Sequence, residues 1–206
     1  MNVYEAINIR RTVRDFEDRQ IDMAIIEKII SAGLKAPTND HMRDWEFIIV
    51  SKSKRAEILN ILPKTYAKSE VSDWLDSWSE DSVQREMYLD AVPKQYAMLY
   101  DAGCLILPFF REDDPLLQPK SLSSLNSFAS IWCCIENILL AATAEGIFGV
   151  TRIPMEEEIQ HIKNMTGHPD GYVMPCYIAL GYPSANATAP KQKEISAKDK
   201  IHMDIW

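Results

Sequence analysis

Apolar residues recur at helical spacing between residues 22 and 35, and this pattern predicts an amphipathic helix. Asp22 can cap its start. Pro37 is expected to end it, because a proline pushes the preceding residue out of the helical region. A shorter helix is expected over residues 4–11, "YEAINIRR". The buried face of the longer helix should be formed by Ile25, Ile26, Ile29, Ile30 and Leu34.

Four runs rich in aromatic and β-branched residues predict strands. They are "WEFIIVS" (45–51), "CLILPFF" (104–110), "IFGVTRI" (147–153) and "PCYIALGYP" (175–183). Helices are expected over residues 54–62, 123–145 and 155–165. The elements mix without strict alternation, which favours an α+β fold over a doubly wound parallel sheet. The helix over 123–145 is apolar over most of its circumference, so we expect it in a large core or between subunits.

Residues 64–94 have the least regular pattern. Trp74 and Trp78 are four residues apart, so one helix could present both on the same face. The segment is either a helical cover packed on the core or a lid over a pocket. A terminal tryptophan on an isolated tail would be an exposed aromatic residue, so we expect it to dock on another surface. The tail after residue 183 is polar apart from four residues. These are Ile201, Met203, Ile205 and Trp206.

The length of 206 residues suits one domain, and 47% hydrophobic with 25% charged residues is ordinary globular usage. We therefore expect a single domain over 1–206, with a helical excursion over about 64–100 and a tail over about 184–206. The net charge of -8, with dispersed Lys and Arg, argues against nucleic acid or an anionic membrane as partner.

The N-terminus, "MNVYEAINIRRTVRDF", has its acid early and its basic residues late, the reverse of a signal peptide. Residues 128–144 are too short and too polar to span a bilayer. A soluble cytoplasmic protein is expected. Its cysteines should be reduced, buried small hydrophobes, since no CxxC pair occurs. The histidines show no metal-ligand spacing, so no metal is expected.

Arg10, Arg11, Thr12 and Arg14 form the first candidate site, "RRTVR". Three guanidinium groups within five residues repel one another unless an anion, an acid or solvent separates them. Two interpretations remain open. The cluster is either a solvated helix end, where cations are favoured, or a phosphate site, because guanidinium groups bind phosphate through paired hydrogen bonds.

Three further signals are weak when taken singly. "APTNDHMRDW" (36–45) is either an exposed turn or one wall of a ligand site. "EGIFGV" (145–150) ends a helix, and its glycines, Gly146 among them, let backbone approach a flat ligand closely. Lys191 and Lys193, in "KQK", are either solvated charges or part of an anion site.

These four segments occur in the order and at the spacing typical of the FMN-dependent nitroreductase family, which the chain resembles over nearly its whole length. The resemblance implies a mostly antiparallel central sheet flanked by helices, in an intertwined homodimer whose tails lie along the partner. It also implies FMN as cofactor and NADH or NADPH as electron donor. The cofactor-binding residues carried over are Arg10, Arg11, Thr12, Arg14, Pro37, Thr38, Asn39, His41, Gly146, Lys191 and Lys193.

By this resemblance, Arg10 holds the FMN phosphate, Thr12 replaces the usual serine, and Arg14 lies by the pyrimidine edge of the flavin. A cation there favours the negative charge that two-electron reduction places on this edge. Lys191 and Lys193 match a K-x-R pair with lysine in the second place. Because FMN performs the chemistry, no catalytic side chain is expected.

Pro37, Thr38 and Asn39 occupy positions that reach the flavin from the other subunit in the family. His41, Arg43 and Asp44 replace the usual Asn, Gln and Pro, so His41 and Arg43, the substrate-side residues, point to a subgroup with a different acceptor or donor. The implied activity is NAD(P)H-dependent, ping-pong reduction of a small nitroaromatic or quinone. The alternatives are a dehalogenase-like or flavin-fragmenting flavoprotein, a non-catalytic FMN-binding protein, and a structural dimer with an empty site.

Overall fold

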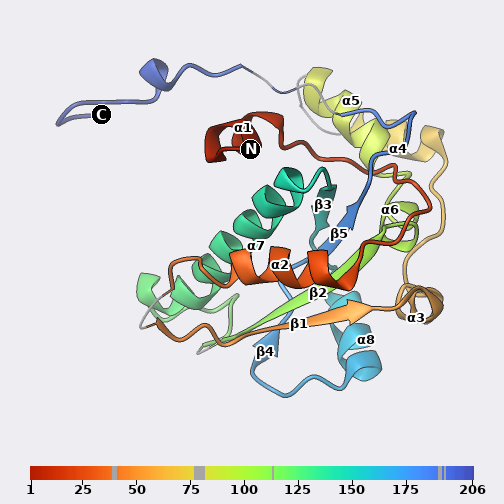
Figure 1. The fold of residues 1–206 in the computed structure, drawn as a ribbon, viewed down its shortest axis with the longest axis horizontal. Coiled ribbons are helices and arrows are strands. Elements are labelled where there is room, and N and C mark those ends of the chain that lie inside the picture. The colour runs from red at the N-terminus through yellow and green to blue at the C-terminus, as the bar shows by residue number, and fades with distance from the viewer. Residues whose placement is uncertain (39–40, 77–81, 113, 190–191, 193) are drawn as a thin grey trace.

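The structure, a computed structural model, describes residues 1–38, 41–76, 82–112, 114–189, 192 and 194–206. Its helices and strands alternate irregularly along the chain (Figure 1). They are α1 (Val3–Ile9), α2 (Met23–Gly33), β1 (Trp45–Val50), α3 (Lys52–Ile58), α4 (Lys68–Leu75), α5 (Ser82–Ala91), α6 (Ala97–Tyr100), β2 (Cys104–Arg111), α7 (Asn126–Ala144), β3 (Phe148–Arg152), α8 (Glu156–Thr166), β4 (Tyr172–Val173) and β5 (Tyr177–Gly181).

The strands form one sheet in the order β1-β2-β5-β3, and β4 also pairs with β2. Every strand pair is antiparallel, with registers such as Trp45 opposite Phe110 and Ile106 opposite Ile178. The expected α+β fold with an antiparallel central sheet is therefore confirmed. The homodimer that accompanied this expectation stays a prediction, and so does the division into one domain with an excursion and a tail.

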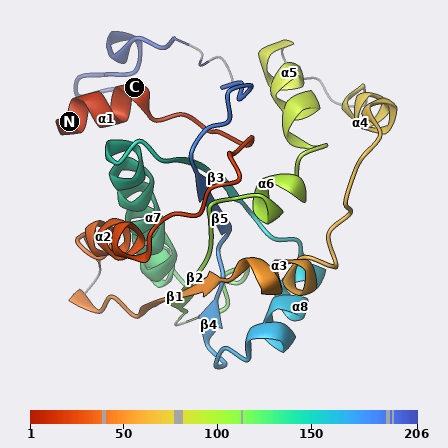
Figure 2. The same cartoon turned by 45° about the vertical axis from the view of Figure 1, so that its right-hand side comes forward.

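Helices cover both faces of the sheet, so its central strand β2 is buried on both sides. Alternate residues of β2 enter different cores. Ile106 packs in the core beneath α2 and α7, whereas Leu105 and Leu107 pack in the core beneath α3 and α8. In Figure 2 the strands lie between these two groups of helices. Burial on both faces explains why β2 is an uninterrupted apolar run rather than an alternating one.

Close packing of α2 on α7 forms one side of the fold. A Cβ atom at Gly33 would lie 2.6 Å from Cγ1 of Ile138 and 3.0 Å from the Cys134 sulfur. The Asp22 carboxylate accepts a hydrogen bond from Ala24 N at 2.9 Å, so the expected cap is confirmed. The expected end at Pro37 is wrong, because the helix ends at Gly33, four residues earlier.

Other expected boundaries also shift. The helix expected over 54–62 runs over Lys52–Ile58, and the one expected over 123–145 begins as a 3₁₀ turn, Leu122–Leu125, before α7. The short strand β4 has no counterpart among the expected elements. Trp74 packs edge-on against Tyr88, with ring centroids 6.3 Å apart. Trp78 lies outside the described residues, so the shared Trp74/Trp78 face stays a prediction.

In a single chain α7 is buried on one side only, and its burial between subunits stays a prediction. One face, including Ile131, Ile135 and Ile138, is buried, but Cys133 and Glu136 are exposed. The exposed thiol also corrects the expectation that all four cysteines are buried. The segment Leu122–Ala144 is long and apolar enough to cross a membrane by length and composition. In this fold it packs instead on α2 and the sheet, as the core helix of a globular protein does.

The C-terminal tail extends away from the body of the chain (Figure 1). Its apolar side chains are exposed, and Trp206 is as accessible as in an isolated residue, at 101%. Trp206 stacks on His202 of the same tail, with ring centroids 4.9 Å apart. The apolar residues of α1 are exposed as well, among them Tyr4 at 77% and Ile7 at 51%. A single chain therefore leaves an extensive apolar surface in contact with water.

Candidate functional site

The basic segment of residues 10–14 runs along the outer edge of β3, the last strand in the sheet order. Thr12 forms a parallel bridge with Gly149, and Val13 N donates to Gly149 O at 3.1 Å. Further on, Glu17 N donates to Tyr182 O at 2.9 Å. These backbone hydrogen bonds hold the segment between β3 and the chain that leaves β5. The backbone positions from which the side chains of residues 10–14 extend are therefore fixed.

The two glycines of "EGIFGV" have different functions. Gly146 adopts a φ of 74° at the end of α7, and a Cβ there would meet nothing within 4 Å. It thus ends the helix beside open space. A Cβ at Gly149 would lie 2.5 Å from Ala179 O, so Gly149 permits close packing against β5. The glycines were expected to let the backbone approach a flat ligand closely. At Gly149 the close approach is instead between the backbones of β3 and β5.

The three arginines of the segment point to different surroundings. Arg10 follows α1, and its Nε lies 3.7 Å from Oε1 of Glu136 on α7, with 28% of its side chain exposed. The guanidinium of Arg11 donates to Asn8 O and Arg10 O, at 2.6 and 2.7 Å. Arg11 therefore caps its own helix end, as the solvated-helix-end interpretation predicts. Arg10 keeps most of its donors unused by the residues that the structure describes.

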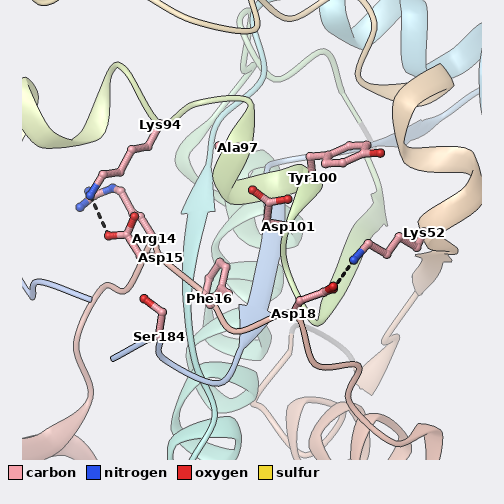
Figure 3. Close-up of a pocket in the computed structure, with 10 residues that line it drawn as sticks. All are labelled: Arg14, Asp15, Phe16, Asp18, Lys52, Lys94, Ala97, Tyr100, Asp101 and Ser184. Atoms are coloured by element: carbon pink, nitrogen blue, oxygen red, sulfur yellow. Dashed lines mark hydrogen bonds and ion pairs between the residues drawn. The ribbon is translucent and has the colours of Figure 1, made fainter. Parts of the chain in front are cut away.

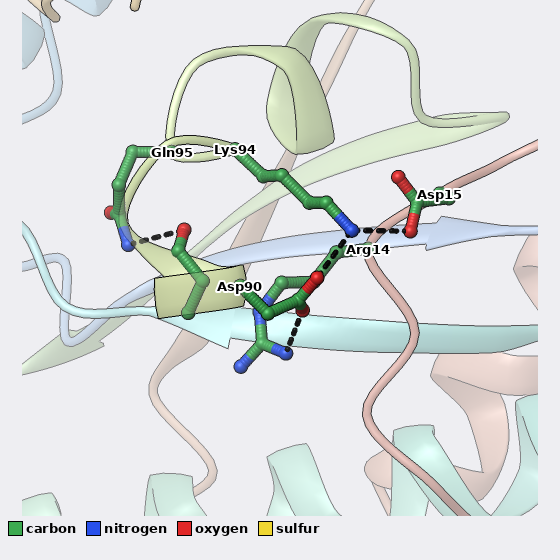
Figure 4. Close-up of polar contacts among 6 residues, drawn as sticks. Arg14, Asp15, Asp90, Lys94 and Gln95 are labelled. Atoms are coloured by element: carbon green, nitrogen blue, oxygen red, sulfur yellow. Dashed lines mark hydrogen bonds and ion pairs between the residues drawn. The ribbon is translucent and has the colours of Figure 1, made fainter. Parts of the chain in front are cut away.

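Arg14 has only 10% of its side chain exposed and belongs to a network of four charged groups. Its Nη1 lies 3.3 Å from Oδ2 of Asp90 on α5 (Figure 4). Lys94 donates to the carboxylates of Asp90 and Asp15 at 2.5 and 2.7 Å. Burial lowers the pKa of Arg14, and the charges of Asp90 and Asp15 offset only part of this shift.

Three members of this network, Arg14, Asp15 and Lys94, line one end of a hollow of about 420 Å³ (Figure 3). At its other end Lys52 pairs with Asp18. The buried Arg55 donates to Tyr100 O at 2.9 Å and so holds α6 against this hollow. The lining residues are Arg14, Asp15, Phe16, Asp18, Lys52, Lys94, Ala97, Tyr100, Asp101 and Ser184. Of the described residues that the sequence assigned to a cofactor, Arg14 alone lines this hollow.

The loop before β1 is shaped by its own side chains. His41 and Arg43 both have positive φ, 58° and 54°, a conformation rarely adopted by residues with a side chain. Arg43 donates to Leu34 O at 2.9 Å and to His41 O at 3.3 Å. Its guanidinium therefore stabilises the loop at the end of α2. Pro37 and His41 are exposed, and Thr38 is half-buried.

The loop and the basic segment do not meet within one chain. The loop lies at the C-terminal end of α2, whereas residues 10–14 follow α1 past the opposite side of the molecule (Figure 1). Asn39, Lys191 and Lys193 lie outside the described residues, so their assignment stays a prediction. Within one chain the structure thus places the basic segment beside β3, which follows the Gly146 turn, and the described loop residues elsewhere.

Sequence reasoning missed Asp90 and Lys94, which contact or surround Arg14. Their distance from Arg14 along the chain is 76 and 80 residues, and they lie in the segment with the least regular pattern. No local spacing signals such a contact. An arginine nearly buried in an acidic protein does require a carboxylate partner, but only the folded chain shows which one.

The antiparallel sheet with helices on both faces and a basic segment along the edge of β3 defines an α+β protein. The model of the Nitroreductase family matches residues 7–182. The chain therefore belongs to the Nitroreductase family, as its motifs predicted.

Among its relatives, the "Putative NADH dehydrogenase/NAD(P)H nitroreductase" of Methanothermobacter thermautotrophicus is 27% identical over 100% of this chain and 88% of its own length. An iodotyrosine deiodinase of Haliscomenobacter hydrossis is 24% identical over 96% of this chain and 85% of its own length. The fold resembles that of an oxidised iodotyrosine deiodinase bound to FMN and 3-iodo-L-tyrosine. The TM-score is 0.73 at 16% identity, with all of both chains covered.

Proposed function

We propose that the protein is an FMN-dependent oxidoreductase that takes electrons from NADH or NADPH and reduces a small nitroaromatic or quinone. The observation that carries the proposal is the position of residues 10–14. Their backbone is hydrogen-bonded along the edge of β3, which follows the Gly146 turn, and Arg10 and Arg14, four residues apart, lie in different surroundings. Relatives whose names include NAD(P)H nitroreductase support the same activity.

The described residues offer hydrogen-bond donors and space that suit FMN. The half-exposed Arg10 has only a 3.7 Å contact with Glu136 among the described residues, so its N–H groups are available to a phosphate. Gly146 borders open space, which leaves room for a ligand beside the backbone. Bound FMN would supply two-electron transfer. The role of the chain is to bind the phosphate through Arg10 and to hold the positive charge of Arg14 at the pyrimidine edge.

The protein is proposed to act as a homodimer. Within one chain, the end of α2 that leads to Pro37 and Thr38 lies away from the basic segment, so a second copy would have to supply the loop residues that the family resemblance places at the flavin. The exposed apolar side chains of α1 and the tail provide the surface for such an association. The cytoplasmic location stays a prediction.

Reductive dehalogenation of a halogenated phenol is the second candidate. Iodotyrosine deiodinases are among the relatives that match nearly the whole chain. His41 and Arg43, which depart from the family pattern, leave the substrate side different from that of the better-known nitroaromatic reducers. A non-catalytic FMN-binding protein and an empty structural dimer complete the set of alternatives.

Purification of the full chain tests the proposal. We expect a yellow protein that releases FMN on denaturation and oxidises NADH or NADPH only when menadione or a nitroaromatic is present. The same preparation with 3-iodotyrosine and a chemical reductant tests the second candidate. Protein that carries FMN but transfers no electrons to any of these acceptors would support the non-catalytic alternative.

The variant Arg10→Ala should strip FMN, because the phosphate loses a charge-assisted pair of hydrogen bonds. Each such bond contributes roughly 1.5–3 kcal/mol, so affinity should fall by at least about tenfold. Arg111→Ala is the matched control, since Arg111 is an exposed arginine at the end of β2, away from the basic segment. Equal FMN affinity in the two variants, measured by fluorescence titration, would contradict the role of Arg10.

A further inference from the structure

The cation assigned to the flavin edge, Arg14, already has a partner on a distant part of the chain. Asp90 lies on α5, within the helical excursion, and approaches the guanidinium to 3.3 Å. Its side chain is 28% exposed and that of Arg14 is 10% exposed. Because this pair is largely shielded from water, solvent screens it less than an exposed ion pair.

Lys94 fixes the position of Asp90. The ammonium group donates to Oδ1 of Asp90 at 2.5 Å, four residues earlier on the chain, and to Asp15 at 2.7 Å (Figure 4). Asp90 thus uses one carboxylate oxygen for Lys94 and the other for Arg14. Its orientation is set from two sides, and it cannot turn away from Arg14 without losing the hydrogen bond to Lys94.

The four groups carry two positive and two negative charges. Arg14 therefore does not act as an isolated cation, because the carboxylate beside it cancels part of its electrostatic field. The other end of the hollow is balanced in the same way by Lys52 and Asp18. A ligand group next to Arg14 would experience less positive potential than the presence of an arginine suggests.

We propose that Asp90 is a positioning residue that holds Arg14 in place and weakens its field, and thereby lowers the reduction potential of the bound flavin. This inference rests on the proposed function and adds to it a residue outside the motifs that carry the family resemblance. It also gives the excursion a function, because α5 supplies the charge that sets the electron affinity of the site.

Asp90→Asn tests the inference, since it removes the charge at almost constant shape. The amide oxygen in Asp90→Asn can still accept a hydrogen bond from Arg14, and the backbone of the basic segment stays bonded to β3, so the guanidinium should remain near its position. We expect the protein to favour reduced over oxidised FMN about tenfold more than before, which is a rise of about 30 mV in the midpoint potential. Asp90→Glu, which keeps the charge, should stay close to the unchanged protein. If the Asn variant folds poorly, the midpoint potential of Asp90→Glu still shows whether a carboxylate at this position maintains the potential of the unchanged protein.

Two comparisons separate this effect from a general loss of negative charge. Asp18→Asn removes a carboxylate from the far end of the same hollow and should leave the potential unchanged. In a protein that also carries Arg14→Gln, Asp90→Asn should raise the potential by less, because only the direct effect of its charge remains and the part exerted through the position of Arg14 is absent.

An unchanged or lower potential in Asp90→Asn would overturn the inference, and so would an equal rise in the Arg14→Gln background. A full chain that takes up no FMN would overturn the proposed function itself. The two failures are distinguishable, because the first is measured on protein that carries FMN.

Discussion

Arg14 is the residue whose surroundings differ most from its sequence context. It lies among arginines that cap a helix end or face solvent, yet its own guanidinium is nearly buried beside a carboxylate. Arg14→Ala should retain some FMN, because Arg10 still binds the phosphate, but the potential of the bound FMN should fall by about 60 mV, a hundredfold change in relative affinity. Arg14→Lys keeps the charge and is the control. An unchanged potential in Arg14→Ala, measured by dye equilibration, would refute the role of Arg14.

His168 gives the fold a pH dependence of its own. Its ring packs on Phe109 with centroids 4.6 Å apart, and its Nδ1 lies 2.9 Å from the Thr166 hydroxyl. Burial lowers the pKa of His168, the charge of Lys163 lowers it further, and Asp170 offsets part of the shift. The folded protein thus binds this proton more weakly than the unfolded chain does.

The stability that comes from neutral His168 is fully present above its unfolded pKa of about 6.5. It is lost as the pH falls from there through the lower pKa of the folded state. His168→Gln should therefore flatten the decline of the free energy of unfolding between pH 7 and about 5, measured by urea titration. His202→Gln, on the exposed tail, should leave the decline unchanged. An identical decline in His168→Gln would contradict this account.

At the scale of elements, the contact between α2 and α7 requires a glycine. An added methyl group at Gly33 would overlap with Ile138 and Cys134. Gly33→Ala should lower the free energy of unfolding by roughly 1–3 kcal/mol from overpacking, less a gain in helix propensity of about 1 kcal/mol. Ser31→Ala, at an exposed position of the same helix, should be neutral or slightly stabilising. A more stable Gly33→Ala protein in thermal unfolding would show that the two helices can separate without loss.

The helices and strands were predictable where a local pattern decides them. The four isoleucines of α2, the cap at Asp22 and the apolar run of β2 each specify an element by themselves. The predicted boundaries of elements were wrong where packing and long-range hydrogen bonds determine the end of an element. α2 ends at Gly33, before Pro37, since the loop is held by hydrogen bonds from Arg43 nine residues after Leu34. Such a contact does not affect the spacing of apolar residues, so the sequence pattern does not reveal it.

The charged network is unpredictable for the same reason. Asp15 and Lys94 are 79 residues apart, and the segment between them contains most of the sequence without a clear period. The positions of Arg10 to Arg14 were identified as a site from their spacing. The partner of Arg14 follows only from how the excursion folds back onto the sheet.

At the scale of the whole molecule, the exposed tail indicates where a second chain would bind. Removal of residues 195–206 takes away Ile195, Ile201, Met203, Ile205 and Trp206, each more than half exposed in the single chain. Their burial against a partner would contribute about 25 cal/mol per Å². The shortened chain should keep its fold by circular dichroism but dissociate at concentrations where the full chain is a dimer.

Lys200→Ala, a change of an exposed polar residue within the same tail, should leave the association of the full chain intact. Sedimentation velocity over a range of concentrations measures both proteins. A shortened chain that remains as tightly dimeric as the full chain would show that the tail does not contribute to the interface.

The account depends on a flavin site that is completed by two copies of the chain. Native mass spectrometry of the purified full chain tests this most directly, because it reports the number of chains and the bound cofactor in the same particle. We predict a species of two chains with two FMN molecules, and loss of both FMN molecules in Arg10→Ala. A single chain that retains FMN, or a dimer that takes up none when FMN is added, would contradict the account.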